Sequence, residues 1–358
     1  MGGSAGQQEA EAPAATQAAR QGLGETLEGS DRGLTAELAP AARLPDFYIV
    51  GHEKCGTTAL YLMLSSHPQI FMPEFKEPRF FAQELRSRFR RLGPGKLPNT
   101  LEEYARLFAD AQHDQLAGEA SPVYLRSHTA AQLLAEATPA AKVVAILREP
   151  ASYLRSFHLQ CVHNHTETQR DLAKALALEP KRRQGKRIPP FSQSPPSLLY
   201  SDHVRYVEQL KRFHAVLGPE QVLVLIYDDF RRDNQATVRQ VLRFLKLDDS
   251  CTIEPVETER LKGVRSLRLM QWRFAVSVVR RRAAASGRAV KAVNALIPTL
   301  PRTGRVGRLR RRMAYGEPPP PDEALMLELR RRYKGEVVAL SEYLGRDLVA
   351  LWGYDKIP

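Results

Sequence analysis

The chain has 358 residues, of which 43% are hydrophobic, and its formal net charge is +13 at pH 7. This length suits one large α/β domain or two smaller ones, and the composition is that of a globular protein with a sizeable core. The sequence has no apolar run long enough to span a bilayer, no secretory signal near its start and only three cysteines. We therefore expect no transmembrane helix, no disulfide framework and a cytoplasmic location.

The positive charge is concentrated in one segment. Residues 260–316 contain 16 Arg and Lys and no Asp or Glu, so the rest of the chain carries a net charge of −3. A local excess of this kind predicts a local anionic partner.

The N-terminal part of the chain divides into a tail and a strand followed by a helix. Residues 1–43 have few large apolar side chains, so they cannot offset their ordering entropy and we expect a disordered tail. The sequence "DFYIV" (46–50) predicts a short buried strand. The sequence "TTALYLMLSSHP" (57–68) has apolar residues at helical spacing and predicts a helix that stops at Pro68.

The loop between this strand and helix has glycines at the spacing of a phosphate-binding loop, but its lysine precedes the second glycine instead of following it. Backbone N–H groups from Lys54 to Thr58 would lie at a helix start, where the helix dipole favours an anion. Lys54 adds a full charge, and Thr57 and Thr58 add hydroxyl donors. We expect an anion site here, and an ordinary glycine turn is the alternative.

The next segment, "PEFKEPRFF" (73–81), places Glu77 in a loop between basic residues and ahead of two phenylalanines. A carboxylate near a bound anion and beside aromatic side chains suits a general base. The alternative is a surface glutamate in an ion pair.

A second buried strand, "KVVAIL" (142–147), is apolar on both faces and ends at Arg148, and Pro150 opens the next helix. An arginine in this place lies at the mouth of an α/β sheet, where ligands bind. Ser156 is about two turns into the helix. The pair would clamp a phosphate through forked guanidinium donors and a hydroxyl. An arginine that caps carbonyl groups is the alternative.

The remaining elements set the fold class. The sequence predicts helices over 201–218 and 233–247, a strand over 221–227, a proline-rich connector over 316–323 and helical packing over 324–352. Strands that alternate with helices predict a central parallel sheet covered on both faces, which is a three-layer α/β/α fold.

Residues 158–165, "HLQCVHNH", combine three histidines with Cys161. Their spacing fits no standard zinc pattern, so we expect no metal site. The alternative for His158, His163 and His165 is a place beside the ligand pocket, because they follow Ser156 on the same helix.

These motifs together resemble the sulfotransferase family that uses 3′-phosphoadenosine 5′-phosphosulfate (PAPS). That family's 5′-phosphosulfate loop reads K-[ST]-G-T-T, and its 3′-phosphate motif is an arginine at a strand end with a serine eight residues later. The Golgi-type carbohydrate members carry a glutamate two residues before a Phe-Phe-like pair, whereas Glu77 lies three residues before Phe80 in an E-x-x-F-F pattern. The resemblance covers about residues 45–358, and it includes "GEASPVYL" (118–125), "YDDF" (227–230) and "LGRDLVALW" (344–352).

The resemblance implies a sulfotransferase domain over residues 44–358 with a P-loop-like phosphosulfate-binding loop. It implies transfer of a sulfuryl group from PAPS, without a metal, to a hydroxyl or amine of a carbohydrate, lipid or small-molecule acceptor. Glu77 would take the acceptor's proton, and Lys54 would neutralise charge on the leaving phosphate. The implied nucleotide contacts are Lys54, Cys55, Gly56, Thr57, Thr58, Arg148, Ser156, Lys262 and Arg265.

Two residues depart from the family pattern. Cys55 stands where serine or threonine is usual, and a thiol is a poorer hydrogen-bond donor than a hydroxyl. Tyr153 stands where carbohydrate-sulfating relatives often have arginine, which weakens any transfer of their acceptor to this chain.

The basic segment is expected to be a helical insertion at about 266–316, in which Trp, Phe, Val and Leu alternate with arginines. Three roles stay open for it: peripheral contact with the inner face of an anionic membrane, a lid over the acceptor, or a cover for the core with its arginines in water.

Two other functions compete with the sulfotransferase interpretation. An ATP- or GTP-dependent phosphotransferase is disfavoured by the displaced lysine and by the pair Arg148 and Ser156. A nucleic-acid-binding protein that uses residues 260–316 has no recognition motif to support it, so we expect no nucleic-acid partner.

Overall fold

A computed structural model describes residues 43–86, 97–190, 192, 194–251, 253–256, 263–264, 266 and 315–357. The predicted disordered tail (1–43) lies outside these residues apart from Arg43. The guanidinium of Arg43 donates to the carbonyl oxygen of Gln112 (2.6 Å) and pairs with Asp46 (2.9 Å). Most of the basic segment, 267–314, also lies outside the described residues.

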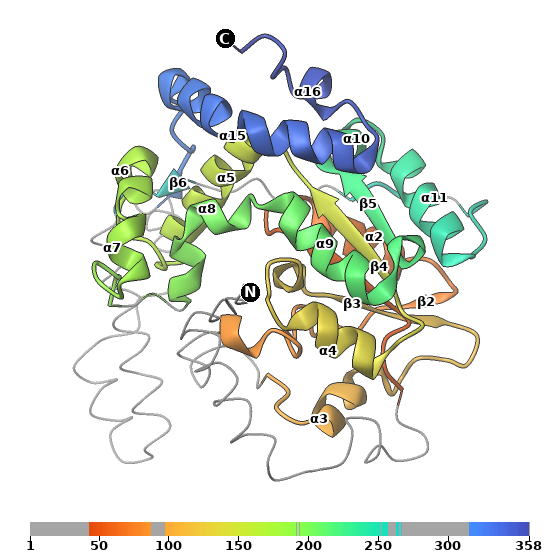
Figure 1. The fold of residues 1–358 in the computed structure, drawn as a ribbon. Helices are drawn as coiled ribbons and strands as arrows, with labels where there is room; N and C mark the ends of the chain where they lie inside the picture. The colour runs from red at the N-terminus through yellow and green to blue at the C-terminus, as the bar shows by residue number, and fades with distance from the viewer. Residues whose placement is uncertain are drawn as a thin grey trace, which may run out of the picture. The chain divides into compact units, whose positions relative to one another are not determined.

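Five parallel strands form the central sheet, in the order β2-β3-β1-β4-β5 (Figure 1). Their bounds are Phe47–Gly51 for β1, Ile70–Phe71 for β2, Leu116–Ala120 for β3, Lys142–Leu147 for β4 and Val222–Ile226 for β5. In the register of the middle strand, Phe47 lies opposite Gly118 of β3 and Lys142 of β4. Residues 47–50 and 143–147 are fully buried, which is typical of parallel strands covered on both faces. The predicted α/β fold with a central parallel sheet is confirmed.

Helices flank this sheet, and Figure 1 shows α9 (Tyr206–Leu217) in front of it and α2 (Thr57–Ser65) behind it. The helix α15 (Glu323–Leu344) packs against α9 and against α5 (Pro150–His163), and α4 (Ala130–Ala137) also packs against α9. The helix α11 (Asn234–Leu245) packs against α2. No helix in the described ranges is long and apolar enough to cross a membrane.

Shorter elements complete the described part of the chain. The short α-helices are α3 (Leu101–Ala105), α6 (Leu172–Ala177), α7 (Glu179–Arg183), α8 (Tyr200–His203), α10 (Tyr227–Arg232) and α16 (Leu348–Leu351). The 3-10 turns are η1 (Gln83–Leu85), η3 (Arg106–Phe108), η4 (Pro122–Tyr124), η5 (Pro195–Leu198) and η6 (Pro219–Gln221). A small antiparallel pair joins β6 (Gly263–Val264) to β7 (Tyr315–Gly316).

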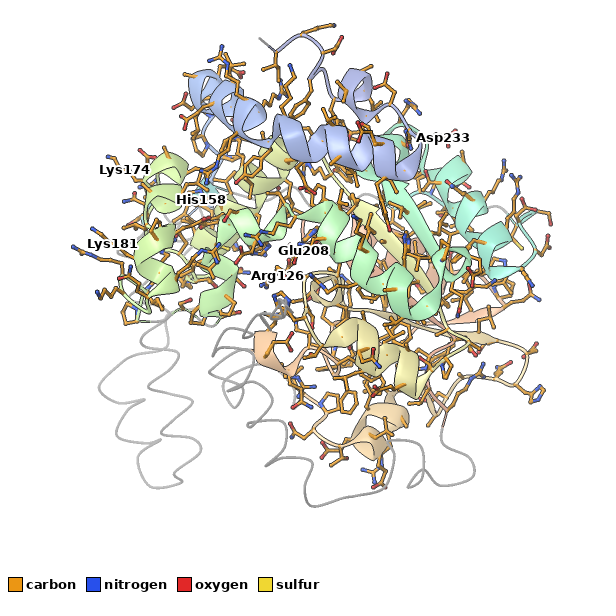
Figure 2. The ribbon with its side chains drawn as sticks, viewed as in Figure 1. Arg126, His158, Lys174, Lys181, Glu208 and Asp233 are labelled. Atoms are coloured by element: carbon orange, nitrogen blue, oxygen red, sulfur yellow. The ribbon has the colours of Figure 1, made fainter. Side chains whose placement is uncertain are left out.

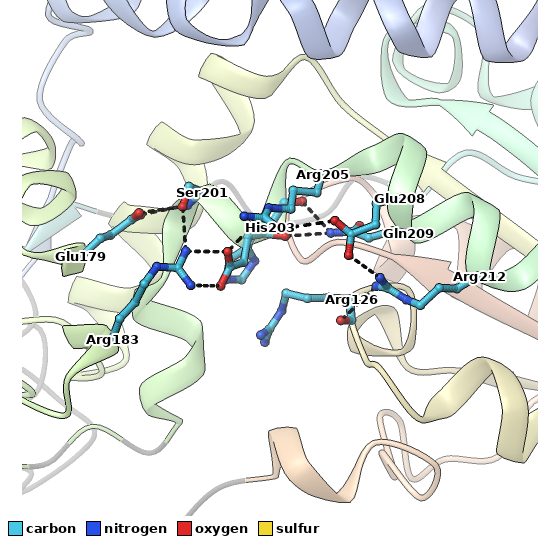
Figure 3. A network of polar contacts seen from close by, with 10 residues as sticks. Arg126, Glu179, Arg183, Ser201, His203, Arg205, Glu208, Gln209 and Arg212 are labelled. Atoms are coloured by element: carbon cyan, nitrogen blue, oxygen red, sulfur yellow. Dashed lines mark hydrogen bonds and ion pairs between the residues drawn. The ribbon is translucent and has the colours of Figure 1, made fainter. Parts of the chain in front are cut away.

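The single helix predicted over 201–218 is wrong at one point, because the structure divides it into α8 and α9. Arg205 leaves the helical conformation (φ −82°, ψ 61°). The side-chain amide of Gln209 donates to the carbonyl oxygens of Asp202 (2.8 Å) and His203 (3.4 Å), which lie where the helix breaks (Figure 3). The Oε1 atom of Gln209 lies 2.9 Å from His52 Nε2. The break is therefore tied to the loop after β1, a contact distant in sequence.

Gly51 ends β1 and lies against β4 with a φ of 132°. A Cβ atom at this position would lie 2.4 Å from the carbonyl oxygen of Ile146, which is a backbone atom and cannot rotate away. The close approach of these two strands therefore requires glycine, for both its missing side chain and its conformational freedom.

We expect the substitution Gly51→Ala to lower the free energy of unfolding by about 3 kcal/mol or more, because the strands must move apart and the backbone is strained. Gly335→Ala in α15 is the matched control, since a Cβ there meets nothing within 4 Å. Alanine at that helical site should leave stability unchanged or raise it by up to about 1 kcal/mol. Urea unfolding followed by circular dichroism measures both variants. Equal stability of the two would contradict the role of Gly51.

Candidate active site

The candidate site lies at two neighbouring strands, β1 and β4, whose following connections run to opposite edges of the sheet. The middle strand β1 leads towards β2 at one edge of the sheet, and its neighbour β4 leads to β5 at the other edge. Such a divergence opens a crevice at the carboxyl ends of parallel strands. The loop 52–56 follows β1 and Arg148 follows β4, so both lie at this crevice.

The loop turns sharply into α2 through two left-handed residues, Lys54 (φ 70°) and Gly56 (φ 87°). A Cβ atom on Gly56 would lie 3.0 Å from the ring of Phe230 and 3.1 Å from that of Tyr227, so glycine lets the loop lie close to α10. No side chain caps the start of α2 at Gly56, and no acidic residue lies in its first turn. The N–H groups of that turn therefore face the crevice without a side-chain acceptor, which suits an anion.

Arg148 fastens the loop to the neighbouring strands. Its Nη1 donates to the carbonyl oxygen of Lys54 at 3.0 Å, and its guanidinium lies 4.8 Å from the ring centre of Tyr227, the residue after β5. The hydroxyl of Tyr206 donates to the carbonyl oxygen of Arg148 at 2.9 Å. The ends of β1, β4 and β5 are thus held together through one arginine.

Lys54 and Arg148 form a positively charged pair. Burial lowers the pKa of the Lys54 ammonium, and the nearby guanidinium of Arg148 lowers it further. Within the described residues, no carboxylate forms an ion pair with either side chain. A bound anion would relieve both effects, because an opposite charge favours the charged form of lysine.

A cleft of about 1040 Å³ opens at this point, and all three predicted motifs contribute to its lining. Lys54, Gly56, Thr57 and Thr58 come from the loop and α2, Arg148 and Ser156 come from the end of β4 and from α5, and Glu77 comes from the segment after β2. The structure therefore brings together side chains that are up to about a hundred residues apart in the sequence.

Glu77 lies in this cleft between two cations. Its Oε2 atom is 2.6 Å from Arg79 Nη2, and its Oε1 atom is 3.5 Å from Lys76 Nζ. The same ammonium donates to Thr58 Oγ1 at 2.7 Å, which links Glu77 to the start of α2. Burial alone would raise the pKa of Glu77, but the two cations outweigh it and hold the pKa below its ordinary value. Glu77 is therefore ionised at neutral pH.

Cys55 is the predicted loop residue that the structure does not bring into the cleft. Its side chain is fully buried in the core, and burial raises the pKa of its thiol to about 12. Its backbone N–H donates to the carbonyl oxygen of His52 at 3.3 Å. The thiol thus behaves as a small apolar group behind the loop. Lys262 and Arg265, the other two predicted contacts, lie outside the described residues.

The far end of α5 forms a polar wall of the cleft. His163 and His165 line it, together with neighbouring polar side chains from Gln160, Asn164 and Thr166 and with Ser194 and Ser197. His158 instead lies in the interior (Figure 2), with Nε2 2.8 Å from the carbonyl oxygen of Gln169. In the part of the chain that the structure describes, no group of three His, Cys, Asp or Glu side chains is arranged to hold a metal ion.

Four cationic or aromatic residues of the cleft were not predicted: Arg79, Arg155, Phe157 and Tyr227. Tyr227 follows β5 just as Arg148 follows β4, so the rule that ligands bind at carboxyl ends of strands would have found it. Arg79 and Arg155 lie beside predicted residues, but nothing in the sequence separates them from other surface arginines. Tyr153, noted as a departure, is buried and bonded to His203 Nδ1 (2.8 Å) rather than exposed to the cleft.

Behind the segment that carries Glu77 lies a buried carboxyl group, Glu119 of β3. Its side chain is fully buried, and its Oε2 atom accepts hydrogen bonds from the hydroxyls of Tyr104 (2.9 Å) and Tyr124 (2.7 Å). Burial raises the pKa of Glu119 to about 7, although the hydrogen bonds offset part of that effect. Glu119 therefore keeps a proton to a higher pH in the folded chain than in the unfolded chain.

Comparison with known proteins gives a consistent set of relatives. A model described as the sulfotransferase family matches residues 45–250. The chain is similar to the crystal structure of a sulfotransferase from Alicyclobacillus acidocaldarius, with 30% identity, a TM-score of 0.53, and coverage of 70% of this chain and 99% of that one. It is 32% identical over 110 residues, or 30% of its length, to the membrane-associated sulfotransferase kil1 of Dictyostelium discoideum. It is 38% identical over 76 residues, or 20% of its length, to carbohydrate sulfotransferase 15 of Homo sapiens.

The chain matches only a small part of the Dictyostelium and human proteins. The alignments cover 21% of the Dictyostelium protein and 12% of the human protein.

The raised pKa of Glu119 predicts a specific loss of stability with pH. The unfolded carboxyl group ionises near its ordinary pKa of 4.5, whereas the folded one holds its proton to about 7. The free energy of unfolding should therefore fall as the pH rises between these values, by on the order of 3 kcal/mol.

Glu119→Gln should remove this component, since the amide does not ionise. Urea unfolding of both proteins at pH 5 and pH 8 measures the difference, and the other titrating groups cancel between them. If the free energy of unfolding changes equally between pH 5 and pH 8 in the wild-type protein and the variant, Glu119 does not bind the proton assigned to it.

Proposed function

The chain belongs to the sulfotransferase family, and on that premise we propose that this sulfotransferase moves a sulfuryl group from PAPS to a hydroxyl or amine of its acceptor. The observation that carries the proposal is the shared cleft of Lys54, Thr57 and Thr58 with Arg148 and Ser156. Two anion-binding groups in one cleft suit a donor that carries a phosphosulfate at one end and a separate phosphate at the other.

In this proposal the loop holds the 5′ end of the donor. Lys54 and the N–H groups at the start of α2 supply positive charge, and the hydroxyls of Thr57 and Thr58 supply directional donors. Arg148 and Ser156 hold the 3′-phosphate. A 3′-phosphate distinguishes this donor from ATP, so this pair of side chains supports the choice of donor.

The proposed reaction is an in-line displacement at sulfur. The acceptor's oxygen or nitrogen forms a bond to sulfur while the bond from sulfur to the leaving phosphate oxygen breaks, and Lys54 neutralises the charge that develops on that phosphate. The acceptor's proton passes to the carboxylate of Glu77. A carboxylate with a lowered pKa suffices, because the acceptor group becomes strongly acidic as it bonds to sulfur.

The end of α5 indicates the kind of acceptor that the cleft would take. The polar end of α5 offers amide, imidazole and hydroxyl groups to it, which suits an acceptor that bears several hydroxyl or amine groups, such as a carbohydrate or a lipid headgroup. One relative is by name a carbohydrate sulfotransferase and another is by name membrane-associated. The cytoplasmic location, and the role of residues 266–316 at a membrane surface or over the acceptor, rest on the sequence alone.

The donor assignment predicts selective binding of 3′-phosphoadenosine 5′-phosphate (PAP) over 5′-AMP by calorimetry. Ser156→Ala and Arg148→Ala should each weaken PAP binding, by about tenfold or more for the arginine, because a hydrogen bond to a charged phosphate is lost. Binding of 5′-AMP should be unchanged by Ser156→Ala.

Arg239→Ala, on the exposed face of α11, is the matched control for the loss of an arginine. Equal affinity of the wild-type protein for PAP and 5′-AMP would overturn the donor assignment.

The role of Glu77 predicts that Glu77→Gln lowers turnover by about a hundredfold or more while PAP affinity stays unchanged, because the amide fills the same space but takes no proton. Turnover is measured as PAP formation from PAPS with glucosamine, octyl glucoside and 2-naphthol as probe acceptors. Glu74→Gln is the control, since Glu74 lies exposed in the same loop. Retained turnover of Glu77→Gln would remove Glu77 from this role.

A further inference from the structure

The segment that carries Glu77 has an unusual backbone. Glu77 (φ 59°) and Arg79 (φ 52°) both adopt left-handed conformations, although neither is glycine. Side chains rarely occupy this region, because the Cβ atom crowds the backbone. Two such residues within three positions persist only where the surrounding structure holds them.

The support comes from the turn after β3, in the sequence "GEASPVYL" (118–125). The N–H of Arg79 donates to Ser121 Oγ at 3.1 Å. The N–H groups of Phe80 and Phe81 donate to the hydroxyl oxygen of Tyr124 at 2.8 and 3.4 Å. Each of the three residues that follow the Glu77-Pro78 pair is therefore bonded to this one turn.

Glu119 sets the direction of the Tyr124 hydroxyl. The hydroxyl has a single proton, which it donates to Glu119 Oε2 at 2.7 Å, so its lone pairs face the N–H groups of Phe80 and Phe81. The rings of Phe80 and Phe81 are buried against Tyr104, with centroids 4.6 and 5.4 Å away. This anchors the chain directly after Arg79, the cation that holds Glu77 Oε2.

We propose that Glu119, Ser121 and Tyr124 are positioning residues for the base: through the N–H groups of residues 79–81 they hold the left-handed segment that places Glu77 in the cleft. This inference rests on the proposed role of Glu77. It goes beyond that role by assigning a function in turnover to three side chains that do not line the cleft.

Tyr104 supplies a matched control for Tyr124. Both hydroxyls are fully buried and both donate to the same oxygen of Glu119, but only that of Tyr124 accepts from the backbone of Phe80 and Phe81. Tyr124→Phe thus removes the support of the segment, whereas Tyr104→Phe removes an equivalent hydrogen bond that has no backbone link to it.

The experiment compares kcat, KM for PAPS and PAP affinity in the two variants, with the probe acceptor that gives the highest wild-type rate. Tyr124→Phe should lower kcat by about tenfold or more, since a small displacement of a reacting group is costly. PAP affinity should stay within about twofold. Tyr104→Phe should lower the thermal stability less than Tyr124→Phe, because it leaves no backbone N–H group unpaired, and should keep kcat within about twofold. The double variant Tyr124→Phe with Glu77→Gln should be no slower than Glu77→Gln alone, because the base is already absent.

Equal kcat values in the two tyrosine variants, with Glu77→Gln inactive, would overturn the positioning role and leave the base assignment standing. An active Glu77→Gln would overturn the base assignment itself. Should Tyr124→Phe fail to fold, Ser121→Ala removes the acceptor of the Arg79 N–H with a smaller change in packing. A lower kcat with unchanged PAP affinity is again expected, and an unchanged kcat would overturn the proposal.

Discussion

The hydrogen bond from Arg148 to the carbonyl oxygen of Lys54 is the contact on which the candidate site depends. It joins the end of β4 to the loop after β1, and the stacking of the same guanidinium on Tyr227 adds the end of β5. The close approach of β1 and β4 at Gly51 brings these ends within reach of each other. A side chain proposed to bind the donor at one end therefore also shapes the loop proposed to bind it at the other.

Charge in the cleft is arranged in two groups with different chemistry. Lys54 and Arg148 are both cations of the cleft, and burial together with the charge of Arg148 lowers the pKa of Lys54. Bound anions would offset this repulsion. Glu77, in contrast, is already neutralised by Arg79 and Lys76, and Lys76 also reaches Thr58 at the start of α2. The proposed base and the proposed donor site are thus linked through one ammonium group.

Buried polar side chains hold the loops that line the candidate site. Glu119 and its two tyrosines lie in the core, yet the hydroxyl of Tyr124 also accepts from the backbone N–H groups of Phe80 and Phe81, shortly after Glu77. On the other side of the loop, His52 contacts Gln209 at the break between α8 and α9. Polar groups in the interior thus connect the flanking elements to the loops at the carboxyl ends of the strands.

The sequence by itself determined the parallel α/β fold, the strands β1, β4 and β5, and the candidate residues in the loop, at the end of β4 and around Glu77. These features are local, since apolar runs, glycine spacing and strand ends are read within a few residues. Tertiary structure alone decided that the three motifs share one cleft, that Cys55 points into the core and that the helix over 201–218 breaks at Arg205. Each of these depends on contacts between residues distant in the sequence, such as Gln209 with His52 or Tyr124 with Phe80, and no local pattern records which distant partner a side chain will meet.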